Sequence, residues 1–341
     1  MKIHEIHMRR AMELAEWGLG TVSPNPMVGC VIVHREEIIG EGYHKYYGGP
    51  HAEVVAIQSV QNQELLTEST VYVTLEPCAH WGKTPPCAHL LVEKQVKKVV
   101  IGAVDTNPLV GGKGIKILKD AGVEVITGVL EEELRFQNRR FFTFIEKQRP
   151  YVILKWAQSQ DGFVARENFD SKWISNPYSR QMVHRWRAEE DAIMVGTNTA
   201  KYDNPKLNVR DWDGKDPLRI VIDKKLELDK SLALFDQGQA TICYNFLKNE
   251  TFDNLEYVKL EDGFQISEIL EDLRSRNIQS LIVEGGSYLL GKFIESELWD
   301  EARVFTGVAS FGGGIPAPAI LKHKHLESEI MGDRLRVFYK S

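Results

Sequence analysis

Residues 49–53 read Gly-Pro-His-Ala-Glu, and residues 76–87 read Glu-Pro-Cys-Ala-His-Trp-Gly-Lys-Thr-Pro-Pro-Cys. Together these segments supply one imidazole, from His51, and two thiols, from Cys78 and Cys87. A catalytic zinc ion takes three such nitrogen and sulfur ligands and keeps its fourth position for water. The two segments therefore predict one zinc ion per chain, bound by these three side chains.

The carboxylate of Glu53 is not needed as a ligand and lies two residues after the imidazole. Zinc lowers the pKa of a bound water towards neutrality, and a nearby glutamate can carry the proton. A His-x-Glu segment followed by Pro-Cys and a second cysteine is typical of zinc-dependent nucleobase deaminases, although their cysteines are closer together. Two alternatives remain open: a structural zinc with His80 or His89 as fourth ligand, and a non-catalytic binding protein stabilised by zinc.

The composition is that of an ordinary globular chain of 341 residues, long enough for two domains. Its 42 basic and 48 acidic residues give a net charge of −6, which argues against a nucleic-acid partner. No apolar run of membrane-spanning length occurs, and the charged residues near the N-terminus lead us to expect no secretion signal. Four cysteines do not make a disulfide framework, so we expect a cytoplasmic protein.

Helical and strand patterns alternate along both halves of the chain, which predicts the α/β class. The polar segment 146–150 divides the halves, so we expect domains over 1–147 and 150–341. The expected helices cover 8–18, 50–60, 87–94, 114–121, 178–187, 266–276 and 288–295, and the expected strands cover 29–34, 70–75, 98–102, 123–128, 151–157, 192–195, 219–223 and 280–284.

Three segments carry a family resemblance: residues 23–30 (Ser-Pro-Asn-Pro-Met-Val-Gly-Cys), residues 49–53, and residues 76–87 with their Gly-Lys-Thr-Pro-Pro-Cys string. With them the chain resembles the bifunctional deaminase/reductases of riboflavin biosynthesis over nearly its whole length. The resemblance implies a cytidine-deaminase-like α/β/α sandwich followed by a dihydrofolate-reductase-like α/β domain. It also implies zinc-dependent deamination of 2,5-diamino-6-ribosylamino-4(3H)-pyrimidinone 5′-phosphate, then NADPH-dependent reduction of the ribosyl group to ribityl.

By the same resemblance, several residues of the first half correspond to substrate contacts. Lys83 and Thr84 match positions that hold the substrate phosphate, a role that suits an ammonium group and a hydroxyl. Asn25, His44 and Asn107 match positions that contact the pyrimidine or the ribose.

In the second half, a strand runs into a helix through Gly285-Gly286, a turn whose N–H groups could approach a pyrophosphate. The resemblance implies that NADPH and the phosphorylated substrate bind around this turn, without indicating an acid or base. The implied NADPH contacts are Ala157, Trp173, Thr199, Asp203, Gly286, Ser287, Tyr288, Leu289, Leu290, Gly291 and Lys292. The implied substrate contacts are Ser171, Arg187, Leu207, Arg210 and Glu284.

Lys224 follows Asp223 at the end of an expected strand, and this strand end matches a family position near the adenosine 2′-phosphate. A cation there would favour NADPH over NADH, so we expect Lys224 to bind the cofactor. The expected partner is a small phosphorylated pyrimidine rather than nucleic acid or a membrane, and we expect a homo-oligomer. The main alternative function is a zinc deaminase of a nucleoside or tRNA base with a second domain that is not a reductase.

Overall fold

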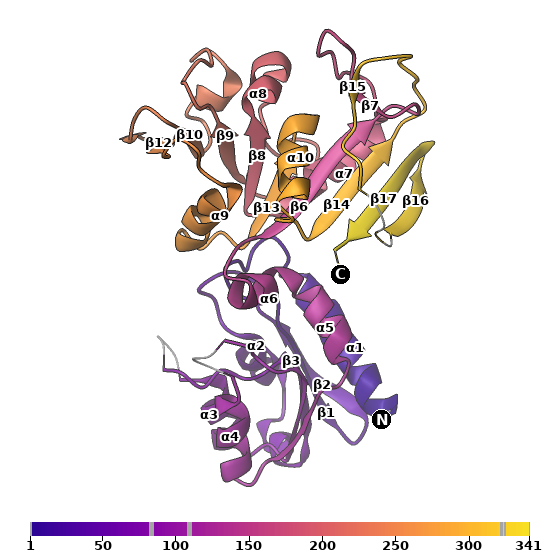
Figure 1. The fold of residues 1–341 in the computed structure, drawn as a ribbon. Coiled ribbons are helices and arrows are strands. Elements are labelled where there is room, and N and C mark those ends of the chain that lie inside the picture. The colour runs from indigo at the N-terminus through magenta and orange to yellow at the C-terminus, as the bar shows by residue number, and fades with distance from the viewer. Residues whose placement is uncertain (1, 82–84, 108–110, 321–322, 324, 341) are drawn as a thin grey trace. The chain divides into compact units, whose positions relative to one another are not determined.

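The computed structural model describes residues 2–81, 85–107, 111–320, 323 and 325–340 (Figure 1). The chain forms two compact units, Met1–Gln148 and Arg149–Ser341. No helix in the described part of the chain is both long and apolar enough to span a membrane.

The first unit is built on one sheet with the strand order β2-β1-β3-β4-β5 across its described residues. β1 pairs antiparallel with β2 and β3, whereas β3, β4 and β5 run parallel. Its elements are α1 (Lys2–Glu16), β1 (Gly29–His34), β2 (Glu37–Tyr43), α2 (Ala52–Ser59), the 3₁₀ helix η1 (Gln63–Glu68), β3 (Thr70–Leu75), α3 (Cys87–Glu93), β4 (Lys98–Ala103), α4 (Lys113–Asp120), β5 (Glu124–Thr127), α5 (Glu131–Gln137) and α6 (Arg139–Glu146).

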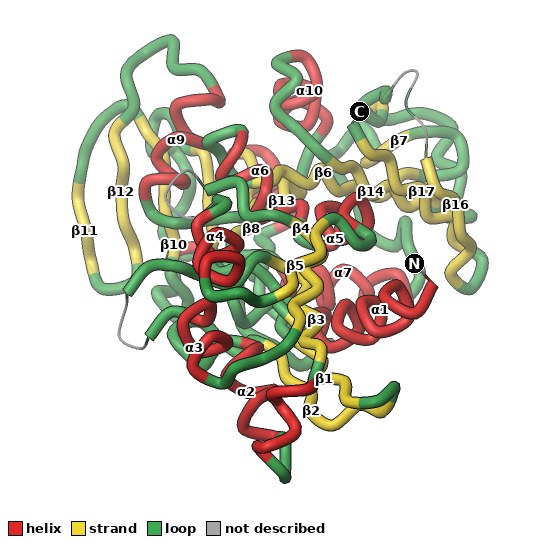
Figure 2. Tube along the Cα trace, turned by 90° about the horizontal axis from the view of Figure 1, so that it is seen from below, coloured by secondary structure: helices red, strands yellow, loops and turns green. Residues whose placement is uncertain are grey.

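Successive side chains of a strand point to opposite faces of the sheet, and helices cover both faces here. On β1, Cys30 and Ile32 pack with α2, α3 and α4, whereas Val31 and Val33 pack with α1, α5 and α6. Figure 2 shows the strands from β5 to β2 as neighbouring yellow segments with helices beside them. The unit is therefore a three-layer α/β/α sandwich.

The second unit is built on a wider sheet, with the order β11-β12-β10-β9-β8-β13-β6-β14-β17-β16 in its described residues. The strands from β12 to β14 run parallel, and β11, β17 and β16 join antiparallel. Its elements are β6 (Tyr151–Gln158), β7 (Phe163–Ala165), α7 (Pro177–Glu189), β8 (Ala192–Gly196), α8 (Thr197–Asp203), β9 (Leu218–Ile222), η2 (Ala233–Phe235), β10 (Thr241–Asn245), β11 (Glu250–Phe252), β12 (Leu255–Lys259), α9 (Ile266–Ser275), β13 (Ser280–Glu284), α10 (Ser287–Glu295), β14 (Glu301–Thr306), β15 (Ile315–Pro316), β16 (His325–Ile330) and β17 (Asp333–Tyr339).

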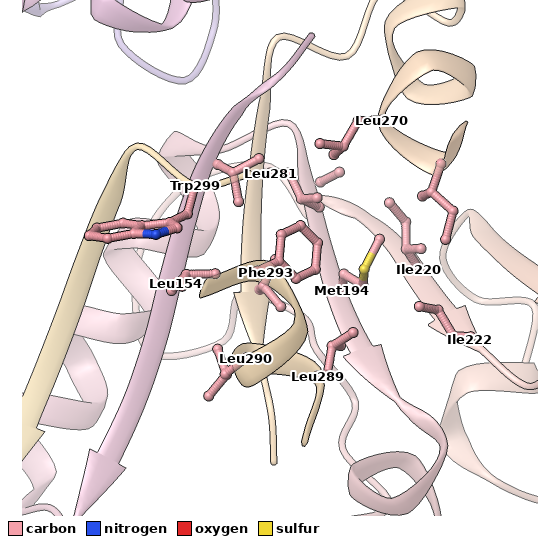
Figure 3. Close-up of a cluster of buried hydrophobic side chains, with 14 of the residues drawn as sticks. Leu154, Met194, Ile220, Ile222, Leu270, Leu281, Leu289, Leu290, Phe293 and Trp299 are labelled. Carbon is pink, nitrogen blue, oxygen red and sulfur yellow. The ribbon is translucent and has the colours of Figure 1, made fainter. Parts of the chain in front are cut away.

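Helices cover both faces of the wide sheet as well. Figure 3 shows Leu290 and Phe293 of α10 facing Leu154 and Met194 of the strands, and all four side chains are fully buried. The opposite face packs against α7 and α8. Each central strand is therefore covered on both sides, as expected for parallel sheets.

Most expected elements exist, with ends shifted by a few residues. The helix expected over 50–60 begins only at Ala52, because His51 is an extended N-cap residue. The helix expected over 8–18 begins six residues earlier, at Lys2. Other described elements were not expected, namely the strands β2, β7, β10, β11, β12, β14, β15, β16 and β17 and the helices α5, α6 and α8. β16 is exposed along nearly its whole length, and the buried β14 contains the charged Glu301 and Arg303, so neither has a simple apolar pattern.

Candidate active sites

The three expected zinc ligands lie at the beginnings of two helices and after one strand of the first unit. His51 is the N-cap of α2, and Cys87 is the first residue of α3. Cys78 follows β3 and accepts a hydrogen bond from the Cys87 N–H at 3.3 Å. The two cysteine loops are fixed to each other by a second bond, from the Ala88 N–H to the Cys78 carbonyl at 3.2 Å.

The ligand atoms have the spacing of a tetrahedral metal site. His51 Nδ1 lies 3.5 Å from Cys78 Sγ and 3.3 Å from Cys87 Sγ. Zinc–nitrogen and zinc–sulfur bonds of usual length place such atoms about 3.6 Å apart. These three side chains form the only metal-ligand cluster among the described residues, and neither His80 nor His89 joins it. Three ligands without a fourth favour a catalytic over a structural ion.

Glu53 lies beside this cluster with only 3% of its surface exposed. Burial and the neighbouring Cys78 raise the pKa of its carboxyl, which favours a group that takes and returns a proton near neutral pH. Residues two apart do not share a helix face. His51 lies before the first residue of the helix, so the rule does not apply to it. The side chains of His51 and Glu53 can therefore reach the same metal site.

Contacts within the cluster shift the pKa values of its two thiols in opposite directions, lowering that of Cys78 and raising that of Cys87. Hydrogen bonds from the Cys87 and His51 side chains lower the pKa of the Cys78 thiol to about 4, so the residue is a ready thiolate ligand. The same contact with Cys78 raises the pKa of His51.

Asn25 and His44 form a hydrogen-bonded pair next to the cluster. His44 Nδ1 lies 2.9 Å from the Pro50 carbonyl oxygen, so this nitrogen must carry the hydrogen. Its Nε2 then accepts from Asn25 Nδ2 at 3.0 Å. Burial lowers the pKa of His44, which keeps the ring neutral. The ring centroids of His44 and His51 are 5.6 Å apart, so the pair borders the metal site.

Two expected phosphate contacts, Lys83 and Thr84, lie outside the described residues. Asn107 follows β4, and its N–H donates to the Asp105 carboxylate at 2.8 Å. The Asp105 N–H in turn donates to the carboxylate of Glu76, which lies two residues before Cys78.

The second unit contains a cavity of about 1150 Å³. Its wall includes residues from the ends of β6, β8, β9 and β13, where ligands of parallel sheets usually bind. Two expected contacts, Leu290 and Gly291, do not line it, and Leu290 is fully buried in the core. The expected contacts that do line it are Ala157, Ser171, Trp173, Arg187, Thr199, Asp203, Leu207, Arg210, Lys224, Glu284, Gly286, Ser287, Tyr288, Leu289 and Lys292.

A buried ion-pair cluster lies in the wall of this cavity. The Arg187 guanidinium donates to both oxygens of Glu284 at 2.9 Å, and Lys155 Nζ lies 3.6 Å from the same carboxylate. Burial alone would raise the pKa of Glu284, but the charges of Arg187 and Lys155 hold it at about 2. Arg187 is therefore already paired within the protein, and Arg210, with its side chain 54% exposed, is the more accessible cation.

The pairs around the Gly285-Gly286 turn organise another part of the wall. Thr199 Oγ1 accepts from the Gly286 N–H at 2.9 Å, and Ser171 donates to Asp203 at 3.1 Å. Trp173 is 78% exposed, with the Arg180 guanidinium 5.2 Å from its ring centroid.

At the expected 2′-phosphate position, the two neighbouring residues differ. The Asp223 carboxylate is fully buried and accepts the N–H groups of Glu227 and Leu228 at 3.1 Å, so it serves a turn. Lys224 lies in the cavity wall with its Nζ 5.1 Å from the ring centroid of Phe264. Only the lysine is therefore available to a ligand.

Sequence reasoning missed two features of the cavity wall. Phe169 and Tyr202 stack at 4.2 Å with their planes 2° apart, and no local pattern indicated that pair. His184 is buried and accepts from the Arg210 N–H at 3.4 Å. Its spacing of three residues from Arg187 places both on one helix face and could have revealed it.

The metal site beside a buried glutamate is that of a zinc-dependent deaminase, and the large cavity at the strand ends of the second sheet suits an enzyme that binds a nucleotide cofactor. Residues 1–103 match the family model of the cytidine and deoxycytidylate deaminase zinc-binding region, and residues 150–330 match that of the RibD C-terminal domain.

The chain is 39% identical to riboflavin biosynthesis protein RibD of Aquifex aeolicus, over 99% of both chains, and 42% identical to that of Actinobacillus pleuropneumoniae, over 90% and 84%. Among solved structures, the Thermotoga maritima diaminohydroxyphosphoribosylaminopyrimidine deaminase/5-amino-6-(5-phosphoribosylamino)uracil reductase superposes with a TM-score of 0.91 at 37% identity, over 100% and 99% of the chains. The chain therefore belongs to the RibD family of bifunctional deaminase/reductases of riboflavin biosynthesis.

Membership confirms the expected fold class of both halves and both cofactors, zinc and NADPH. It also favours the bifunctional enzyme over a nucleoside or tRNA deaminase with an unrelated second domain, because the match covers both halves.

Proposed function

We propose that residues 1–147 remove the 2-amino group of 2,5-diamino-6-ribosylamino-4(3H)-pyrimidinone 5′-phosphate as ammonia. Residues 150–341 then reduce the ribosyl group of the product to ribityl. The observation that carries the first assignment is the cluster of His51, Cys78 and Cys87 with Glu53 buried beside it.

In the deaminase unit, His51, Cys78 and Cys87 would hold the zinc, which when bound supplies an activated water. Glu53 takes a proton at its carboxylate and returns it to the departing amine, a role that its raised pKa favours. Asn25 already donates its amide N–H to His44, which leaves its oxygen to accept from a substrate N–H. Lys83, Thr84 and Asn107 complete the substrate contacts that family membership supports.

In the reductase unit, NADPH supplies a hydride when bound, and the residues of the cavity bind and orient the two reactants. The backbone N–H groups in the first turn of α10, which begins at Ser287, suit the cofactor pyrophosphate, whereas the Gly286 N–H already donates to Thr199. Arg210 suits the substrate phosphate, and Ser171 can donate to it once its hydroxyl turns away from Asp203, with Arg187 and Glu284 beside them. Positioning rather than proton transfer then carries most of the catalysis.

We further propose a cytoplasmic homo-oligomer that acts on a small phosphorylated pyrimidine. The unpaired thiols of all four cysteines suit a reducing compartment. Leu326 of β16 and Met331 after it are 66% and 71% exposed, which suits a surface covered by a second copy. Light scattering of the purified chain measures that assembly.

One assay tests the division of labour. The purified chain is given the diaminopyrimidine phosphate, and ammonia release and NADPH absorbance are followed together. Ammonia should appear without NADPH, and supplied deaminated intermediate should consume NADPH without releasing ammonia. Chelation should stop only ammonia release; loss of both activities in a folded protein would contradict the proposal.

A further inference from the structure

The carboxylate of Glu76 is buried within the first unit without belonging to the metal cluster. The residue lies directly after β3 and is 4% exposed. Its Oε2 accepts the N–H groups of Asp105 at 3.4 Å and Gly112 at 3.0 Å. Its Oε1 accepts those of Gly114 at 2.9 Å and Ile115 at 3.2 Å. One side chain thus binds four backbone donors of a single distant segment.

Three of these donors belong to the beginning of α4. The N-cap residue of this helix is Gly112, which has no side chain to accept from the free N–H groups of the first turn. Glu76 takes that place from another element, and its negative charge also suits the positive end of the helix dipole. The carboxylate therefore fixes where α4 begins.

The same segment lies in close contact with the backbone of the cysteine loop. A Cβ atom added at Gly114 would lie 2.0 Å from the Pro77 carbonyl oxygen, so only glycine allows this approach. Pro77 is the residue between Glu76 and the ligand Cys78. The beginning of α4 and the metal-ligand loop are thus held together by both hydrogen bonds and packing.

The fourth donor links Glu76 to Asn107. The Asp105 N–H points to Glu76, and the Asp105 carboxylate accepts the Asn107 N–H at 2.8 Å. The Asn107 carbonyl in turn accepts from the Gly111 N–H at 2.8 Å. A short chain of hydrogen bonds therefore runs from the residue before Pro77-Cys78 to the backbone of Asn107.

We propose that Glu76 is a positioning residue for deamination, which sets the place of Asn107 relative to the zinc ligand Cys78. The inference rests on the proposed substrate contact of Asn107. Since chemistry depends on the alignment of substrate and activated water, a displacement of about 1 Å can cost about 100-fold in rate. Glu76 acts through Asp105 and Asn107 and does not itself touch substrate.

The test is a double-mutant cycle of Glu76→Gln and Asn107→Ala in the full-length zinc-loaded enzyme. The glutamine keeps the shape but turns an amide N–H towards backbone donors. Each single variant should lower kcat/KM for ammonia release by about 10- to 100-fold. Combining them should cost little more than the larger single effect, because both remove the same contact. Zinc content should stay near one per chain, and reduction of supplied deaminated intermediate should not change.

A merely structural role predicts a different result. Asn62→Ala removes the side-chain cap of η1 in the same unit and serves as the control for lost stability alone, with unchanged kcat/KM. If Glu76→Gln behaves like this control, the proposal is overturned. Additive effects in the cycle, or loss of zinc in Glu76→Gln, would also overturn it, because Glu76 would then act by another route.

Two further measurements keep the cycle decisive. If Glu76→Gln does not fold, Asp105→Ala cuts the chain at its second bond and leaves the cap of α4 intact. It should give the same fall in kcat/KM and the same non-additivity with Asn107→Ala; a normal kcat/KM would contradict the proposal. An Asn107→Ala enzyme with full activity would refute its substrate contact and the positioning role together, whereas absence of ammonia release from the unmodified enzyme would refute the proposed deamination itself.

Discussion

The two candidate sites are built in opposite ways. In the first unit, the ligand atoms of His51, Cys78 and Cys87 lie within 4.8 Å of one another, and the residues come from two short sequence segments. In the second unit, the functional residues come from distant parts of the sequence and line a cavity of about 1150 Å³. Lys155 lies on β6 and Glu284 on β13, and α7 lies between these strands in the sequence. A metal site depends on a few ligand atoms, whereas a site that orients two large reactants depends on many residues along the cavity wall.

This difference predicts how the two activities respond to substitution. In the compact site, substitution of a single ligand or of Glu53 removes metal binding or proton transfer, because no neighbouring residue can take over that role. In the cavity, binding energy is shared among many groups, so single changes should reduce affinity or stability by degrees.

The largest effect should follow Glu53→Gln. Loss of general acid–base catalysis typically costs about 10²–10⁴-fold, so ammonia release should fall by that factor. Reduction of supplied deaminated intermediate should stay nearly intact, because it uses the other unit. Parallel assays of both activities measure this, and an equal collapse of both in a folded variant would refute separate sites.

Cys87→Ser should remove the metal. Serine is a much weaker zinc ligand than a thiolate, so zinc measured by metal analysis should fall sharply from near one per chain. Cys30→Ser is the matched control, since Cys30 is fully buried and outside the cluster. Full zinc retention in the Cys87 variant would refute its assignment as a ligand.

Glu284→Gln should destabilise the second unit by about 3 kcal/mol, because it leaves the buried Arg187 and Lys155 without their counter-charge. Glu295→Gln is the matched control: its ion pair with Lys292 is exposed and should contribute less than about 1 kcal/mol. Urea unfolding compares the two. Equal losses would show that the ion-pair cluster has no special weight.

His184 should make the second unit less stable in mild acid. Burial, with Arg187 and Arg210 nearby, lowers its pKa from 6.5 to about 4. The unfolded chain therefore takes up a proton first as the pH falls, and stability is lost between about pH 6.5 and 4. From pH 7 to 5 the loss should be about 2 kcal/mol. Subtracting the pH profile of the stability of His184→Gln removes the contribution of the other titrating groups. If the two stability profiles run parallel, the assignment to His184 is wrong.

The smallest effect concerns cofactor choice. Lys224→Ala should raise KM for NADPH with little effect on NADH, by about 1–2 kcal/mol or about 5- to 30-fold, because it removes a charged phosphate contact. Lys225→Ala is the control at the next exposed lysine. Steady-state kinetics with both cofactors decide the matter, and an unchanged preference would leave Lys224 with its contacts to the rings of Phe246 and Phe264.

The fold was largely predictable where the residue pattern is simple. The strands 29–34, 70–75 and 280–284 have the expected ends, because fully buried strands are continuous apolar runs. Not every buried strand was predicted: β10 and β14 were missed, and β14 contains the charged Glu301 and Arg303, which pair with each other. The outer strands β2, β16 and β17 were missed as well. One face of an outer strand is solvated, and exposed residues such as Leu326 obscure its alternation.

The sequence by itself determined the metal-ligand set, because His51, Cys78 and Cys87 are marked by residue type and by short spacing. Only the tertiary structure decided the partners of the other charged groups. Arg187 and Glu284 lie 97 positions apart, and Glu76 meets its helix 38 positions away. Such pairs depend on which strands become neighbours in the sheet, and strand order is set by the packing of the whole unit rather than by local pattern.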